Sequence, residues 1–125
     1  MELQSIYEKL QIQDMNQMQK STYTATENQQ DVILLSPTGS GKTLAFLIPV
    51  LRTLDKNTSG IQALIMVPAR ELALQIEQVF KSMGTDFKIS ICYGGHDKKI
   101  EINNFREAPA ILIGTPGRIS YHLRN

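Results

Sequence analysis

An apolar run that leads straight into a loop with two glycines constrains this fold more than any other feature. Residues 31–36 read DVILLS, and the next residues, PTGSGKT, end at Thr43. A continuous apolar run is typical of a strand buried on both faces of a parallel sheet. Glycines after such a strand let consecutive backbone N–H groups turn around one anion, and the following helix points its positive end at the same place. The stretch therefore predicts an α/β fold with an anion-binding loop.

The loop also fits a phosphate-binding pattern, G-x-x-x-x-G-K-[ST], except that Ser36 stands at the first glycine. That position asks only for a small residue with ordinary backbone angles. We expect Lys42 to reach the terminal phosphates and the Thr43 hydroxyl to bind Mg²⁺, so these two are the predicted catalytic residues and Thr43 the predicted metal ligand. The alternative is a purely structural turn between strand and helix. The predicted nucleotide contacts in the loop are Thr38, Gly39, Ser40, Gly41, Lys42 and Thr43.

The rest of the chain alternates predicted strands and helices. Apolar runs predict further buried strands over residues 61–67, 87–93 and 110–115. Apolar residues at helical spacing predict helices over residues 42–54, 69–83, 97–105 and 116–124. This alternation implies right-handed crossovers and a parallel sheet with helices on both faces.

The residues before the first strand predict two short N-terminal helices, near residues 3–10 and 15–25, with Asp14 as a candidate cap for the second. The length of 125 residues suits one compact domain or part of one. We therefore predict one domain over residues 1–125, made of N-terminal helices (1–30) and an α/β core (31–125).

Composition excludes several classes of protein. The formal net charge is +1, so no global basic field attracts nucleic acid, and any such contact must come from placed groups. The longest apolar stretch, LAFLIPVL, is too short to span a bilayer, and the N-terminus has no signal-peptide layout. Cys92 is the only cysteine, which excludes an intrachain disulfide and favours a reducing compartment. We expect a cytoplasmic protein.

Three short motifs follow the later predicted strands: PARELA from Pro68, YGG from Tyr93 and TPGR from Thr115. Open α/β sheets bind ligands at the carboxyl ends of their strands, where these motifs fall. Together with the phosphate loop and the upstream Gln19, this order resembles the first RecA-like domain of DEAD-box RNA helicases over about residues 14–123. The resemblance implies a partial RecA-like P-loop domain that uses ATP, Mg²⁺ and RNA.

The resemblance also implies roles for single residues. Gln19 is similar to the glutamine that reads adenine. The segment that ends at Gln19 reads MNQMQ, where the family usually has Pro-Thr-x-Ile-Gln, and Ala69 replaces a common threonine. The expected contacts with the RNA backbone are Pro68, Arg70, Glu71, Gly94, Gly95, Thr115, Pro116, Gly117 and Arg118.

Elementary chemistry agrees with these assignments. Gly94 and Gly95 allow close approach of a sugar-phosphate chain, because neither has a Cβ. Thr115 offers a hydroxyl and a helix start with free N–H groups, while Arg70 and Arg118 supply charge. Such contacts would be tolerant of base sequence and sensitive to salt. Taken singly, each motif also has an ordinary explanation as a turn or a solvated helix start.

Hydrolysis needs an acid at a strand end to hold magnesium and a carboxylate to orient water. None of the predicted strands ends in Asp-Glu, and in the family the Asp-Glu-Ala-Asp box lies shortly downstream of TPGR. We therefore expect these 125 residues to bind Mg-ATP weakly without turning it over, and the strand before the loop to have unpaired edges. The intact protein would need its second RecA-like domain.

Three readings of function stay open: part of an ATP-dependent RNA helicase, a non-catalytic nucleotide- or RNA-binding module, and a DNA-directed P-loop helicase. Two lesser features have simpler interpretations. Cys92, His96 and Asp97 cluster in sequence, but their spacing matches no zinc pattern. His122 is expected to be a solvated helix residue.

Overall fold

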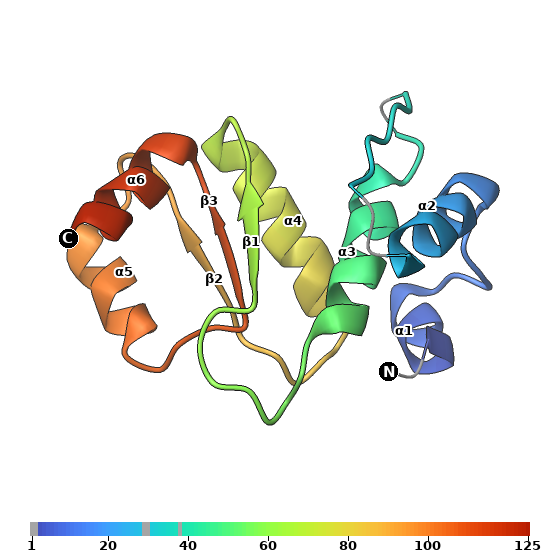
Figure 1. The fold of residues 1–125 in the computed structure, drawn as a ribbon, viewed down its shortest axis with the longest axis horizontal. Coiled ribbons are helices and arrows are strands. Elements are labelled where there is room, and N and C mark those ends of the chain that lie inside the picture. Colours follow the sequence, from blue (N-terminus) through green and yellow to red (C-terminus); the bar gives the residue numbers. More distant parts are fainter. Residues whose placement is uncertain (1–2, 29–30, 38) are drawn as a thin grey trace. The chain divides into compact units, whose positions relative to one another are not determined.

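The computed structural model describes residues 3–28, 31–37 and 39–125 (Figure 1). Thr38, one of the predicted nucleotide contacts, lies outside these residues. The elements in chain order are α1 (Leu3–Leu10), α2 (Gln17–Glu27), α3 (Lys42–Thr53), β1 (Ala63–Met66), α4 (Arg70–Ser82), β2 (Ile89–Cys92), α5 (Lys98–Phe105), β3 (Ile111–Gly114) and α6 (Pro116–Arg124). No helix among the described residues is both long enough and apolar enough to cross a membrane.

The three strands form a parallel sheet in the order β1-β3-β2. All four residues of the central strand β3 are buried, as expected of a strand with neighbours on both sides and helices on both faces. Figure 1 shows α4 on one side of the strands and α5 with α6 on the other. The predicted parallel sheet covered by helices is therefore confirmed.

The chain divides into two compact units. The first, which we call the helical unit, holds residues 1–53 and 82–84, and the second, the sheet unit, holds residues 54–81 and 85–125. In the helical unit α2 packs on α3, and Arg52 of α3 joins them. Its Nη1 donates to the Tyr23 carbonyl oxygen at 3.1 Å, and its guanidinium lies 4.3 Å from the centre of the Tyr23 ring.

The strand predicted over residues 31–36 is absent. Residues 31–37 have no regular structure, and Ile33 and Leu35 are 88% and 89% exposed. A strand is stabilised by hydrogen bonds to a neighbouring strand. Among the described residues β1 and β2 each pair with β3 alone, so this apolar run has no such neighbour.

The start of α2 also differs from its prediction, because Asn16 rather than Asp14 caps the helix. The Asn16 side chain accepts from the Gln19 backbone N–H, and the Gln19 side chain accepts from the Asn16 backbone N–H, each at 2.9 Å. This reciprocal pair is a capping box. Asp14 instead bonds the Lys20 ammonium at 3.0 Å, and this hydrogen bond lowers the pKa of Asp14.

Candidate functional site

The loop after residue 35 is held in shape by glycines and serines. Gly39 and Gly41 have φ angles of +83° and +91°, which L side chains rarely adopt. The Ser40 hydroxyl donates to the Pro37 carbonyl oxygen at 2.6 Å and lies 2.5 Å from the Ser36 hydroxyl. Ser36 therefore contributes a hydrogen bond at the position where the general pattern has glycine.

Lys42 and Thr43 are the first two residues of α3, directly after this loop. The first N–H groups of a helix have no partner within the helix, and the helix dipole makes this end positive. The loop therefore offers backbone donors, one ammonium group and one hydroxyl to an anion. A single hydroxyl suits Mg²⁺, which is usually held by few protein groups together with substrate phosphates and water.

Two side chains at the start of α2 fix the loop backbone. Asn16 Nδ2 donates to the Ser40 carbonyl oxygen at 2.9 Å, and Gln19 Nε2 donates to the Gly41 carbonyl oxygen at 3.1 Å. A Cβ added to Gly41 would lie 2.6 Å from Gln19 Nε2, so no side chain fits between them. The N-x-x-Q spacing at residues 16–19 is a signal that could have predicted the helix cap, but not these contacts with the loop.

Gln19 is buried, with 5% of its surface exposed. Its amide group carries two N–H donors and two oxygen lone pairs, and the contacts above use one of each. The edge of a nucleobase could bind the remaining N–H donor and the remaining oxygen lone pair. The contact with adenine stays a prediction, but the position of Gln19 against the loop is compatible with it.

The strand-end surface is the name we give to the nine residues predicted to contact RNA. The register places the strand ends together, since Met66 of β1 and Cys92 of β2 both align with Gly114 of β3. The ladder continues past these ends: Val67 N–H donates to the Gly114 carbonyl oxygen at 3.0 Å, and Thr115 N–H to the Cys92 carbonyl oxygen at 3.1 Å. The sheet therefore brings all three motifs to one edge. The members of the strand-end surface are Pro68, Arg70, Glu71, Gly94, Gly95, Thr115, Pro116, Gly117 and Arg118.

Most of the strand-end surface is open. A Cβ added to Gly94, Gly95 or Gly117 would meet nothing within 4 Å, so a ligand backbone can approach there. Thr115 is the N-cap of α6, yet its side chain makes no capping hydrogen bond. The Thr115 hydroxyl and the first amides of α6 are thus placed to donate to a phosphate.

The two arginines of the strand-end surface differ in environment. The Arg70 side chain is 57% exposed, and its guanidinium lies 5.8 Å from the centre of the Tyr93 ring. Arg118 is buried, and its Nη1 donates to Glu101 Oε1 at 3.1 Å. Only Arg70 therefore presents its charge to solvent, and Arg118 is engaged within the protein.

Glu101 is the functional candidate that sequence analysis missed. It is fully buried on α5, and four groups donate to its carboxylate: the Tyr93 backbone N–H, His96 Nδ1, Arg118 Nη1 and His122 Nε2. The prediction of a solvated His122 is wrong, since only 12% of that side chain is exposed. Helical spacing gave no sign of the cluster, because its partners come from separate elements.

The other sequence cluster, Cys92, His96 and Asp97, forms no metal site. His96 bonds Glu101, and Asp97 caps α5 by accepting from the Lys99 N–H at 2.8 Å. Within residues 3–28, 31–37 and 39–125, no group of three potential metal ligands is found. Burial, together with the nearby Glu101 carboxylate, raises the pKa of Cys92 to about 11.

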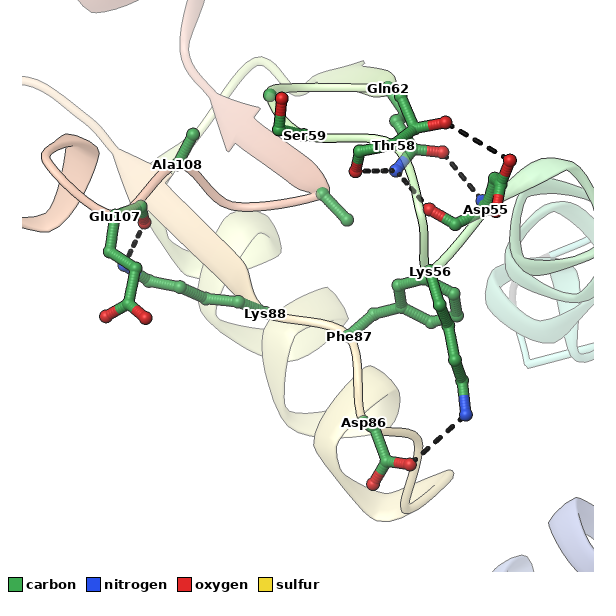
Figure 2. Close-up of a pocket in the computed structure, with 12 residues that line it drawn as sticks. Asp55, Lys56, Thr58, Ser59, Gln62, Asp86, Phe87, Lys88, Glu107 and Ala108 are labelled. Atoms are coloured by element: carbon green, nitrogen blue, oxygen red, sulfur yellow. Dashed lines mark hydrogen bonds and ion pairs between the residues drawn. The ribbon is translucent and has the colours of Figure 1, made fainter.

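A cavity of ≈ 430 Å³ lies in the sheet unit, near the amino ends of the strands, and none of the predicted site residues lines it (Figure 2). Its two lysines bind neighbouring protein groups. Lys88 Nζ donates to the Asn104 and Glu107 carbonyl oxygens at 2.7 and 2.5 Å, and Lys56 pairs with Asp86 at 3.3 Å. We therefore assign this cavity a structural role.

Known proteins resemble the chain over nearly its whole length. The family profile of DEAD/DEAH box helicases matches residues 16–125. The DEAD-box ATP-dependent RNA helicase CshC of Bacillus cereus is 37% identical over 119 residues, which are 94% of this chain and 31% of that protein. DEAD-box ATP-dependent RNA helicase 8 of Arabidopsis thaliana is 40% identical over 119 residues, or 94% of this chain and 23% of that protein.

Solved structures agree with this result. The crystal structure of the yeast DEAD-box splicing factor Prp28 superimposes with a TM-score of 0.84 at 29% identity, and the match covers 98% of this chain and 31% of that one. The chain thus spans less than a third of the length of each of these three relatives.

Proposed function

Because the chain belongs to the DEAD/DEAH box helicase family, we propose that it binds ATP with Mg²⁺ at residues 36–43 and the RNA backbone at the strand-end surface. One observation carries the proposal: the register of the parallel sheet gathers three sequence motifs at the carboxyl ends of its strands. Ligands of open α/β sheets bind at this edge.

ATP would be held by the loop through backbone amides and Lys42. The N–H groups of Gly39, Ser40 and Gly41 would donate to the phosphates, and the Lys42 ammonium would neutralise the terminal phosphates; Thr38 stays a nucleotide contact predicted from the sequence motif. The Thr43 hydroxyl would hold Mg²⁺. When bound, this ion shields the charge of the phosphate oxygens. Gln19 would read the adenine edge with its remaining donor and acceptor.

RNA would be bound by its sugar-phosphate chain. Gly94, Gly95 and Gly117 give room for a close approach, Thr115 and the α6 amides donate to a phosphate, and Arg70 supplies charge. Pro68, Glu71 and Pro116 shape the same surface, and Arg118 supports it through Glu101. None of these groups reads a base edge, so affinity should be tolerant of sequence and fall steeply with salt.

The wider protein is proposed to be an ATP-dependent RNA helicase whose second RecA-like domain completes the site and couples ATP hydrolysis to local RNA unwinding. None of the three described strands ends in Asp-Glu, so we propose that these 125 residues bind the nucleotide without hydrolysing it. The proposed domain is the whole of residues 1–125, with the N-terminal helices (1–30) and the α/β core (31–125) as its parts. A cytoplasmic location stays a prediction based on the single cysteine.

A nucleotide-binding assay tests the first half of the proposal. Lys42→Ala should weaken binding of a fluorescent non-hydrolysable ATP analogue in Mg²⁺ by about 10- to 100-fold, because a hydrogen bond to a charged group contributes about 1.5–3 kcal/mol. Lys56→Ala is the matched control, since that lysine is exposed, lies outside residues 36–43 in the sequence and pairs with Asp86. Equal affinities of the two variants would refute nucleotide binding at Lys42.

An RNA-binding assay tests the second half. Arg70→Ala should weaken binding of a labelled single-stranded RNA. It should also make the dependence of the log association constant on log salt concentration shallower by about 0.7. The control is Arg106→Ala, which removes the same charge from an exposed residue outside the strand-end surface. Tighter binding of DNA than of RNA would favour the DNA-directed helicase. Phosphate release stimulated by RNA would refute the proposed lack of turnover.

A further inference from the structure

We propose that Glu101 is a positioning residue that holds the three predicted RNA-contacting motifs in place relative to one another; this inference rests on the proposed function. Glu101 is fully buried, so it cannot contact RNA itself. Its effect must pass through the groups that donate to its carboxylate.

The Glu101 carboxylate accepts hydrogen bonds from the residues on either side of Gly94 and Gly95. Glu101 Oε2 accepts from the Tyr93 backbone N–H at 3.1 Å and from His96 Nδ1 at 2.7 Å. Tyr93 directly precedes Gly94, and His96 directly follows Gly95. One backbone hydrogen bond, from the His96 N–H to the Tyr93 carbonyl oxygen at 3.1 Å, closes this turn, and its two glycines leave the rest of its backbone free to vary. One oxygen atom therefore restrains both ends of this turn.

The second carboxylate oxygen holds α6, the helix whose N-cap is Thr115. Glu101 Oε1 accepts from Arg118 Nη1 at 3.1 Å and from His122 Nε2 at 2.6 Å. These residues lie four apart on α6, so they share one face of that helix. Fixing this face sets the position of the Thr115 hydroxyl and of the free amides at the helix start.

The third motif joins through stacked side chains. The Tyr93 and His96 rings stack with centroids 4.7 Å apart and 23° between their planes. The Arg70 guanidinium lies 5.8 Å from the centre of the Tyr93 ring. A continuous series of contacts therefore runs from the exposed arginine through Tyr93 and His96 to Glu101.

The charges make this cluster sensitive to loss of the acid. Arg118 is always charged and buried, and a buried cation without its partner is strongly unfavourable. If the carboxylate is lost, Arg118 and the two imidazoles must find water or move. The loops that carry the strand-end surface would move with them.

The test compares Glu101→Gln with Ile119→Val, measured at a temperature where both are fully folded. The glutamine keeps the size of the side chain but lacks the charge and one acceptor oxygen. Ile119 is buried on the same helix, packs on Cys92 and Leu112, and makes none of the hydrogen bonds to the carboxylate. For Glu101→Gln we expect RNA affinity to fall about tenfold while affinity for the ATP analogue stays within twofold. Ile119→Val should change neither affinity by more than twofold.

Amide hydrogen exchange supplies a readout that does not need RNA. In Glu101→Gln we expect faster exchange at residues 93–96 and 115–118 than in the parent chain, but no change at residues 76–82, the half of α4 farther from Arg70. His96→Phe keeps a ring against Tyr93 and removes the donor to Glu101, so it decides the matter if Glu101→Gln does not fold. It should lower RNA affinity about threefold and speed exchange at residues 93–96.

Several results would overturn the inference: unchanged RNA affinity in the folded Glu101 variant, an equal loss of ATP affinity, or exchange at both motifs like that of Ile119→Val. If Glu101→Gln does not fold, unchanged RNA affinity and exchange in His96→Phe would have the same consequence. If the parent chain itself does not bind RNA, the proposed function fails, and the exchange data alone then decide whether Glu101 orders the motifs.

Discussion

Replacing Gly41 by alanine tests how strongly the nucleotide loop depends on the start of α2. Gly41 has a φ of +91°, and an added Cβ would lie 2.6 Å from Gln19 Nε2 and 3.3 Å from Asn16 Nδ2. The alanine would therefore face both an unfavourable backbone angle and a steric clash. Gly39 separates the two effects, because its φ is +83° but nothing lies within 4 Å of an added Cβ.

The expected magnitudes follow from this geometry. An L residue at positive φ costs roughly 1–2 kcal/mol, which Gly39→Ala and Gly41→Ala should share. The clash at Gly41 would also break the hydrogen bond from Gln19 Nε2 to the Gly41 carbonyl oxygen. A buried amide left without a partner costs about 1–3 kcal/mol. We therefore expect a loss of about 2–5 kcal/mol in the free energy of unfolding for Gly41→Ala.

Urea unfolding followed by circular dichroism measures both losses. The sharpest form is a double-mutant cycle with Gln19→Ala, which removes the side chain that the new methyl group would hit. In that background Gly41→Ala should cost only the backbone strain, so the coupling energy should be about 1–3 kcal/mol. A coupling below about 0.5 kcal/mol, or equal losses for the two glycine variants, would show that the contact with Gln19 does not hold the loop.

Four further predictions concern the packing of each unit. Because the pKa of Cys92 is about 11, its reaction with iodoacetamide at pH 8 should be about 100-fold slower in the folded than in the unfolded chain. The folded chain keeps this thiol proton at a pH where the unfolded chain loses it, so the free energy of unfolding should fall as pH rises from about 9 to about 11. Gly114→Ala should lower the free energy of unfolding by about 1–3 kcal/mol in urea, since its Cβ would lie 2.6 Å from Cys92 Sγ and 2.7 Å from Ile119 Cγ1. An unchanged free energy would contradict this packing. Arg52→Met should cost about 1–2 kcal/mol in the same assay by removing the contacts with Tyr23, and an unchanged midpoint would show that those contacts do not join α2 to α3.

Sequence patterns predicted the local elements well because each depends on residues close together in the chain. The parallel strands β1, β2 and β3 were predicted from apolar runs, and helix α4 was predicted from apolar residues at helical spacing. The run over residues 31–36 carries the same signal but forms no strand. Periodicity reports which residues prefer burial, whereas a strand also requires a neighbour to pair with.

The candidate sites show the same limit. Lys42 and Thr43 follow from a contiguous motif, so their place at the start of α3 could be predicted. The Glu101 cluster could not, because its members are brought together from the turn after β2, from α5 and from α6 only by folding. A histidine such as His122 has no sequence mark that separates a solvated residue from a buried one.

The exposed apolar run also has a consequence for handling the protein. Val32, Ile33 and Leu35 face water, and the backbone beside them has no ladder to join. Short unpaired segments with high β-propensity are preferred starting points for intermolecular aggregation. Solutions of this chain should therefore turn turbid sooner when the protein concentration or the temperature is raised. A charged substitution at Ile33, the gatekeeper strategy of natural strands, should delay that turbidity while leaving the sheet of the second unit unchanged.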